Sequence, residues 1–214
     1  MFVPDQYRAP APEWALDVLR ANPLATLVSA GSQDPLATHL PAIPDETTLR
    51  DGQGETGLVG VTLLGHLNRA NPHWTALQAG VPSLLIFSGP HGYVSPTYYR
   101  TDPAAPTWNF TAIHVHGAAV PVAGREATLA VVRETVRIFE RDFGTGWDMG
   151  SSVPYFERML SGVGAFRLRV TAAEAMFKLS QEKPPEVRQL VERSFAASSL
   201  GTHRELAAAM RRLW

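Results

Sequence analysis

The chain has 214 residues, enough to bury a core of its own, and its 45% hydrophobic and 18% charged content is that of a globular protein. Its 19 basic and 20 acidic residues give a net charge of -1, so no overall positive field attracts nucleic acid and only a local basic patch could do so. The absence of cysteine excludes disulfides, thiolate metal sites, iron–sulfur clusters and cysteine nucleophiles.

The first residues, MFVPDQY, lack the basic stretch followed by an apolar core that is typical of a signal peptide. No apolar run in the chain approaches the length of a membrane span. We therefore expect a cytoplasmic protein with no membrane partner.

Short apolar runs separated by turn residues predict the first elements. The predicted elements are a helix at 12–22, strands at 24–29 and 36–43, a helix at 72–79 and a strand at 82–88. A turn at 31–35 would join the first two strands as a hairpin, and residues 44–56 read as a polar surface loop. Gly89-Pro90-His91-Gly92 would close the 82–88 strand as a tight turn.

Residues 57–74 carry the main functional prediction. Residues 59–64 are apolar with β-branched members, which predicts a buried strand, and Gly65 interrupts the pattern. His66 is then expected at the strand-to-helix turn, where its side chain can face a pocket. Arg69 and Asn71 lie at the expected helix start, whose free N–H groups can hold a phosphate or a carboxylate. The alternative is a plain corner with a buried histidine.

The second half begins with a long, half-buried strand at 107–122, in which Trp108, Phe110, Ile113 and Val115 alternate with Asn109, Thr111, His114 and His116. Residues 125–143 predict the best helix, with Leu129, Val132, Val136 and Phe139 on its apolar stripe. The remaining predicted elements are a helix at 154–160, a strand at 164–170 that 176–180 continues or follows, and helices at 186–195 and 202–213. Mostly antiparallel strands with inserted helices predict an α+β barrel, a single domain over 1–214 with C-terminal helices from about 184.

Three further segments place chemically useful groups at predicted strand ends. The groups are His91 and Tyr93 in the first, Trp108 and Asn109 in the second, and Lys178, Ser180 and Gln181 in the third. Strand ends around a barrel mouth can converge on one ligand, and aromatic rings supply the flat wall that a planar cofactor needs. Each also has a plainer explanation: a turn, a core tryptophan or a solvated charge.

Four ordered motifs carry a family resemblance: GHLNRANPHW at 65–74, GPHGYVSPTYY at 89–99, PTWNF at 106–110 and KLSQ at 178–181. With MFVPDQY at 1–7 and ATHLP at 37–41, they resemble the FMN-binding negative transcriptional regulator family of the PaiB type. The resemblance covers nearly the whole chain. It implies an FMN-binding split β-barrel of the flavin-reductase kind, with peripheral helices, that forms a homodimer with the cofactor at the dimer interface.

In its details the chain is more similar to one branch of that family, the haem-dependent piperazate synthases. These enzymes join the two nitrogens of an N-hydroxylated ornithine into a cyclic hydrazine. The details are residues 61–64, Asn68, His73, Ala105, Phe110, residues 182–183, and the segments 141–147 and 162–169. The resemblance therefore implies haem b as cofactor, with FMN as the alternative, and a small amino-acid substrate.

The resemblance also implies roles for the candidate residues. His66 is the first candidate for the axial ligand of the iron, followed by His91 and His39, and Arg69 would neutralise a haem propionate or the FMN phosphate. Trp108 would pack on the cofactor ring, while Tyr93, Lys178 and His91 would donate protons or contact substrate. The rest of the cofactor-binding set is Asn71, Asn109, Ser180 and Gln181.

Two other functions fit the same sequence. One is an FMN-binding PaiB-type regulator or flavin reductase that uses the same pocket. The other is a regulatory module that acts through DNA or protein contacts, using a basic face of the C-terminal helices: Arg188, Arg193, Arg204, Arg211 and Arg212. These arginines alternate with glutamates, which favours a solvated helix surface, and no recognition helix is evident.

Overall fold

The structure is a computed structural model that describes residues 1–31, 34–99 and 101–214. The helices are α1 (Pro12–Ala21), α2 (Pro72–Gln78), α3 (Arg125–Asp142), α4 (Val153–Met159), α5 (Pro185–Ala196) and α6 (Gly201–Leu213). The strands are β1 (Leu24–Ser29), β2 (Leu36–Pro44), β3 (Thr62–Asn68), β4 (Pro82–Val94), β5 (Thr107–Pro121), β6 (Val163–Arg169) and β7 (Ala172–Lys178). Within the described residues, no helix has the length and apolar content needed to cross a membrane.

The strands form one antiparallel sheet that closes on itself, which confirms the predicted α+β barrel. Their hydrogen-bonded order is β4-β1-β2-β3-β6-β5-β7, and β4 also pairs with β5, so β7 lies outside the ring along β5. Residues 110–116 of β5 pair with β7, whereas residues 119–121 pair with β6. The partners change at Gly117, where a Cβ atom would lie 2.4 Å from the carbonyl oxygen of Arg169. Glycine therefore lets the sheet split at this point.

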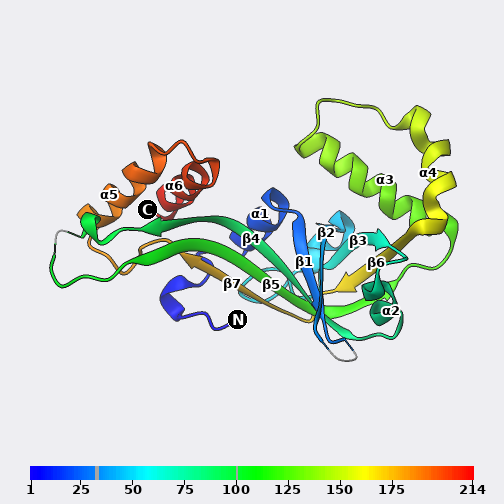
Figure 1. The fold of residues 1–214 in the computed structure, drawn as a ribbon, viewed down its shortest axis with the longest axis horizontal. Coiled ribbons are helices and arrows are strands. Elements are labelled where there is room, and N and C mark those ends of the chain that lie inside the picture. The colour runs from blue at the N-terminus through cyan, green and yellow to red at the C-terminus, as the bar shows by residue number, and fades with distance from the viewer. Residues whose placement is uncertain (32–33, 100) are drawn as a thin grey trace.

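Two long strands extend beyond the barrel. The outer part of β4, residues 88–94, and the start of β5, residues 107–112, remain paired with each other and form a projection that we call the arm. Figure 1 shows α5 and α6 packed on one side of the arm, with α1 further along the same side. Helices α3 and α4 lie at the opposite end of the molecule, where α3 packs on β3 and β6.

The largest core cluster fills the barrel and the space beneath α1, α5 and α6. Its fully buried members include Leu27, Leu63, Leu85, Phe87, Ile113, Phe166 and Leu168. A second, smaller cluster joins α3 to the outside of the barrel through Ile43, Leu64, Val131, Ile138 and Ala165. The two clusters lie on opposite sides of β3, as the alternation of a strand requires.

The predicted apolar stripe of α3 is wrong by one residue. Its buried side chains are Thr128, Val131, Thr135 and Ile138, while Leu129, Val132, Val136 and Phe139 are only half-buried. The two threonines can be buried because their hydroxyl groups donate to the carbonyl oxygens of Gly124 and Val131, at 2.8 and 2.9 Å. A threonine whose hydroxyl donates to a carbonyl of its own helix can be buried, but a pattern of polar and apolar residues does not predict this burial.

Two strands are longer than the sequence predicts. Gly65 does not end β3, which continues to Asn68, because its missing side chain leaves room for the ring of Phe166; a Cβ atom would lie 2.5 Å from Phe166 Cζ. The predicted turn at 89–92 is a β-bulge between Ser88 and His91 inside β4. A Cβ atom at Gly89 would lie 2.0 Å from Thr111 Oγ1, so close packing explains this glycine too.

The phase predicted for β5 is also wrong. The strand alternates without a break, so Trp108 and Phe110 share a face with His114, while Asn109 and Ile113 point to the buried side. Apolar residues therefore lie on both faces of β5.

The other predicted helices and strands are confirmed to within a few residues, and the segment predicted at 176–180 is the end of a separate strand, β7, which runs from Ala172 to Lys178. The 44–56 loop contains a short 3-10 helix, Glu46–Asp51. The turn predicted at 31–35 includes residues 32–33, which lie outside the described residues.

Candidate functional site

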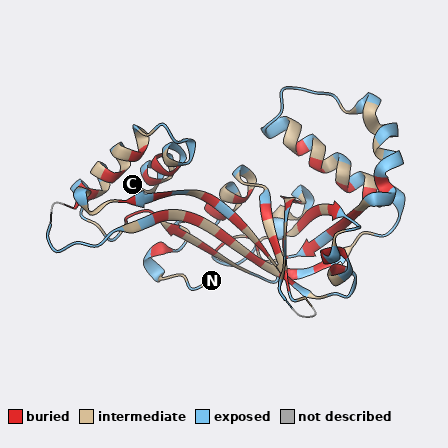
Figure 2. Cartoon of the chain, viewed as in Figure 1, coloured by how far each residue is buried: buried red, intermediate tan, exposed pale blue. Residues whose placement is uncertain are grey.

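One side of the arm carries exposed aromatic rings. Figure 2 shows buried positions alternating with exposed or half-buried ones along the outer parts of β4 and β5. On β4, Gly92 is buried against Phe195 of α5, whereas His91 and Tyr93 are exposed. Tyr93 and Trp108 lie directly opposite each other on the open side, with ring centroids 5.9 Å apart and planes at 69°. They are 48% and 52% exposed, and the ring of His91 lies 6.1 Å from that of Trp108. These are large apolar surfaces to leave in water.

A cation borders these rings. Lys178 pairs with Phe110 across β5 and β7, and its Nζ donates to Thr107 Oγ1 and lies 5.8 Å from the centre of the Tyr7 ring. We use the name aromatic face for the surface formed by His91, Tyr93, Trp108, Phe110 and Lys178. The structure thus brings together four residues predicted from three separate segments: His91, Tyr93, Trp108 and Lys178.

The aromatic face continues over the barrel as a half-buried band. Its apolar members are Leu84 and Ile86 on β4, Ala112 on β5 and Met176 on β7. Its titratable members are His114, His116 and Glu174, with His116 Nε2 3.0 Å from Glu174 Oε2. Burial lowers the pKa of His114, and the N-terminal amino group lowers it further. Burial alone would raise the pKa of the Glu174 carboxyl, but hydrogen bonds from His116 and the N-terminal amino group outweigh it and lower the pKa.

Sequence reasoning missed Tyr99, which lies at the tip of the arm. Its phenol oxygen is buried with no hydrogen-bond partner among the described residues, and Lys183 Nζ lies 4.2 Å above its ring. Burial first, then the negative charge of Glu182, raises the pKa of Tyr99. In the sequence, Tyr99 is marked only by its place in the aromatic 89–99 segment. Its neighbours in the fold, Glu182 and Lys183, come from beyond residue 180.

Asn109, Ser180 and Gln181 do not reach the aromatic face. Asn109 is fully buried on the opposite side of β5, where its Nδ2 donates to Ser180 Oγ at 2.8 Å. Gln181 folds back on its own turn, because its Oε1 accepts from the N–H of Leu179 at 2.6 Å. Ser180 adopts a φ of 67°, in the left-handed region that tight turns use. These contacts shape the chain after β7.

His66, Arg69 and Asn71 form a separate group. His66 lies inside β3 and not at a turn, half-buried on the side that faces α3, and its Nδ1 has no partner among the described residues. Burial lowers its pKa. Arg69 Nε donates to the carbonyl of Val163 at 2.8 Å, and Asn71 caps α2 by accepting from the N–H of His73 at 2.9 Å.

The two groups lie at opposite ends of β5. His66 pairs with Ala165, whose carbonyl accepts from the N–H of Val122, just beyond the end of β5. Trp108 is near the start of the same strand. Fourteen residues at about 3.3 Å each separate Trp108 from Val122, or roughly 45 Å of strand. A single chain therefore does not bring the aromatic face and His66 to one cofactor.

The C-terminal arginines are largely engaged within their own region. Arg211 pairs with Glu192, and the Arg188 guanidinium lies 4.4 Å over the ring of Trp214. Arg204 donates to the carbonyl oxygen of Ser198 at 2.9 Å. These contacts favour an ordinary solvated helix surface over a basic face that would contact DNA or another protein.

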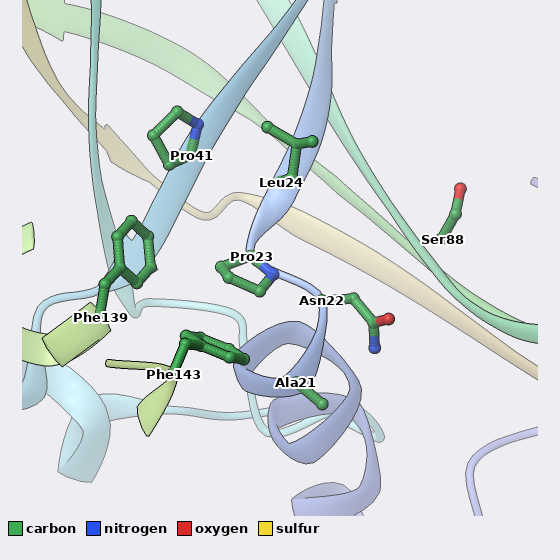
Figure 3. Close-up of a pocket in the computed structure, with 8 residues that line it drawn as sticks. All are labelled: Ala21, Asn22, Pro23, Leu24, Pro41, Ser88, Phe139 and Phe143. Carbon is green, nitrogen blue, oxygen red and sulfur yellow. The ribbon is translucent and has the colours of Figure 1, made fainter. Parts of the chain in front are cut away.

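A cavity of about 570 Å³ lies away from the predicted residues, where α1 turns into β1 (Figure 3). The rings of Phe139 and Phe143 face Pro23, Leu24 and Pro41 across it. Its lining is almost entirely apolar and contains no titratable group, so it offers packing surface and no acid–base chemistry.

Known proteins resemble this chain over most of its length. The protease synthase and sporulation protein PAI 2 of Bacillus subtilis (strain 168) is 29% identical over 185 residues, which cover 86% of this chain and 83% of that protein. An uncharacterized protein of Aspergillus fumigatus is 28% identical over 225 residues, 86% of this chain and 85% of that one.

Solved structures share the fold. The FAD and haem binding protein from Mycobacterium smegmatis superposes with a TM-score of 0.57 at 17% identity, over 79% of this chain and 72% of that one. The conserved hypothetical protein Rv2991 from Mycobacterium tuberculosis does so with a TM-score of 0.56 at 15% identity, over 86% of this chain and 94% of that one. These similarities support the split-barrel architecture.

The family model described as "Putative FMN-binding domain" matches residues 1–172, which include the whole barrel up to the start of β7. The chain therefore belongs to this FMN-binding domain family.

Proposed function

We propose that the protein binds FMN on the aromatic face and uses it as a redox enzyme in the form of a homodimer. The observation that supports the proposal most is the pair of half-exposed rings, Tyr93 and Trp108, beside the ammonium group of Lys178. A protein that has no ligand for this surface leaves apolar area in water, which is unfavourable.

The residues present fit the chemistry of FMN. Its flat ring system can stack on Trp108 or Tyr93, and its phosphate carries negative charge that Lys178 can neutralise. Bound FMN would supply reversible transfer of electrons or of a hydride. The protein's own part is to orient the ring through Trp108, to exclude water, and to hold a proton donor, Tyr93 or His91, beside it.

A second copy would complete the site. The aromatic face and the half-buried band beside it lie on one continuous side of β4, β5 and β7, too open to exclude water from a reacting flavin. Pairing two such faces about a two-fold axis would bury Leu84, Ile86 and Met176 together with the cofactor. In such a dimer, the surface around His66 of the partner subunit could approach the cofactor on the aromatic face of the first chain. The first chain's own His66 lies too far from that cofactor.

The absorption spectrum of the purified protein tests this proposal. We expect the two visible bands of a flavin, or their appearance together with quenched flavin fluorescence when FMN is added to the protein. A protein that binds neither added FMN nor haem would overturn both this proposal and the next one.

A haem-dependent cyclase is the second candidate, supported by the similarity to the piperazate synthase branch and by the buried Nδ1 of His66, which has no hydrogen-bond partner in the described part of the chain. The solved M. smegmatis relative is itself described as binding haem. The reaction would be redox-neutral: the hydroxylamine nitrogen of an N-hydroxylated ornithine forms a bond to the α-amine nitrogen, while its oxygen leaves as water. Bound haem would supply an iron acting as Lewis acid. Tyr93 and Lys178 would protonate the leaving oxygen or hold the substrate, and His66 would have to come from the other copy in a dimer, because one chain does not bring it to the aromatic face.

This candidate predicts a Soret band instead of flavin bands. His66→Ala should then abolish the resting iron spectrum, and added imidazole should partly restore it. His91→Ala is the matched control and should alter turnover more than the resting spectrum. The opposite pattern would show that His91 is the ligand and that the assignment of His66 is wrong.

A further inference from the structure

We propose that His114 makes the pairing of two copies sensitive to pH, so that the dimer forms while His114 is neutral and separates when His114 takes up a proton. This control rests on the proposed function, in which two copies pair through the aromatic face and the half-buried band beside it. Acid then separates the two faces and exposes the cofactor between them to water.

His114 lies in the middle of the half-buried band. It is on β5, with Ile86 of β4 opposite it on one side and Glu174 of β7 opposite it on the other. The alternation of β5 puts its ring on the same side as Ala112 and Trp108. The ring is half-buried in a single chain, so it loses more of its contact with water when a second copy covers the band.

The groups around His114 do not offer its proton a partner. Glu174 is the acidic residue that faces it, but Glu174 Oε2 already lies 3.1 Å from the N-terminal amino group and 3.0 Å from His116 Nε2. On β4 the neighbours on this face, Leu84 and Ile86, carry no charge. Burial lowers the pKa of His114, and the charges of the N-terminal amino group and His116 lower it further, against the opposing effect of Glu174. His114 is therefore neutral at neutral pH and gains its proton only in acid.

Symmetry doubles every charge on this face. Two copies that pair about a two-fold axis contribute the same residues, so an unbalanced charge on one copy meets an equal charge on the other. At neutral pH the Glu174 carboxylate and the N-terminal amino group balance each other, and in the proposed site the FMN phosphate balances Lys178. A face with so little net charge is suited to a second copy of itself. A proton on each His114 adds two positive charges beside Ile86 and Met176, where a charge loses its hydration.

The dependence on pH has one direction. His114 loses water in the dimer, so its pKa is lower in the dimer than in the separated chain. Association is therefore strongest above the pKa of the separated chain and weakens as the pH falls below the ordinary histidine value of about 6.5. Each histidine can weaken association by up to about tenfold per pH unit, and a dimer contains two.

Sedimentation equilibrium of the whole chain between about pH 8 and about pH 5.5 tests this proposal, with circular dichroism at each pH to follow the fold. We expect the dissociation constant of the dimer to rise at least about tenfold over this range, and His114→Gln to remove the rise. A dimer with a constant dissociation constant, or a His114→Gln variant that keeps the full dependence, would overturn the proposal and leave FMN binding by the dimer standing. A protein that is monomeric even at about pH 8 would overturn both this control and the proposed homodimer.

His114→Lys tests the same charge without acid. Lysine is protonated at about pH 8, so this variant should weaken the dimer about as much as acid weakens the unchanged protein. His203 is the matched control, because it is a half-buried histidine of α6 on the other side of the sheet, where a Cβ atom at Gly92 would lie 3.2 Å from its ring. His203→Lys should associate normally. If His114→Lys associates as tightly as His203→Lys, the proposal is wrong.

Discussion

Replacement of Trp108 by alanine separates a cofactor-binding tryptophan from a structural one. Trp108 is 52% exposed, so its truncation leaves an open surface and no sealed cavity. A buried tryptophan costs about 3–5 kcal/mol when it is cut to alanine, and with half the burial and no cavity we expect about 1–2 kcal/mol here. Trp74 is 7% exposed and packs on Gly164, where a Cβ atom would lie 2.5 Å from its ring, so Trp74→Ala should cost the full amount.

Trp108→Ala should weaken FMN binding without unfolding the protein. Loss of a stacked aromatic partner together with its apolar contact is worth about 1–2 kcal/mol, a factor of about 5–30 in the dissociation constant. Fluorescence titration with FMN measures the affinity, and urea unfolding measures the stability. Trp147→Ala is the matched control, because Trp147 is 48% exposed but lies between α3 and α4. If Trp108→Ala unfolds like Trp74→Ala, or binds FMN like Trp147→Ala, the assignment of the aromatic face is wrong.

Three other substitutions test the packing and the buried polar groups. Gly65→Ala should destabilise the fold by about 1–3 kcal/mol in urea unfolding, because the new Cβ would lie 2.5 Å from the buried ring of Phe166; a neutral effect would contradict the packing argument. Burial lowers the pKa of His73 below 6.5, so the unfolded chain takes up a proton that the folded chain refuses, and stability should fall as the pH drops below about 6.5. His73→Gln should flatten this part of the curve measured between about pH 8 and pH 5; an unchanged slope would exclude His73 as its source. Tyr99→Phe removes a buried hydroxyl that has no partner among the residues the structure describes, and it should be neutral or stabilising by up to about 1 kcal/mol in thermal unfolding, whereas a clear loss would reveal a partner for that hydroxyl.

Features with a local cause could be predicted from the sequence. The helix starts at Pro12 and Pro72 follow from proline at the first helical position, and Asn71 caps its helix by accepting from the N–H of His73, two residues away. The alternation of β5 also made its length predictable, from Thr107 to Pro121. Each of these signals lies within a few residues of the element that it shapes.

Features caused by distant residues could not be predicted. Gly65 and Gly92 look like strand breakers, but they stay inside strands because Phe166 and Phe195 pack against them from far along the chain. The relative positions of distant strands are hidden in the same way, and so four motifs at predicted strand ends suggested one convergent site. The sequence does not reveal that β5 carries two of those groups apart, with Trp108 near its start and His66 beside its far end.

The candidate site was therefore predictable in part. His91, Tyr93, Trp108 and Lys178 lie on one face because β4, β5 and β7 are neighbours in register, whereas the sequence suggested their convergence only from their places at predicted strand ends. Asn109 was predicted at the same site because its amide, like the Trp108 ring, lies at the start of a predicted strand, yet adjacent residues of a strand point to opposite faces.

Sedimentation velocity, recorded at a flavin absorption band that the protein lacks, tests the central claim most directly. If FMN binds on the aromatic face between two copies, the flavin should sediment with a species of twice the 23.3 kDa of one chain. Trp108→Ala should release flavin from that species, while Trp147→Ala should retain it. Flavin that sediments with a single chain at full occupancy, or that stays with the dimer when Trp108 is removed, would contradict the account.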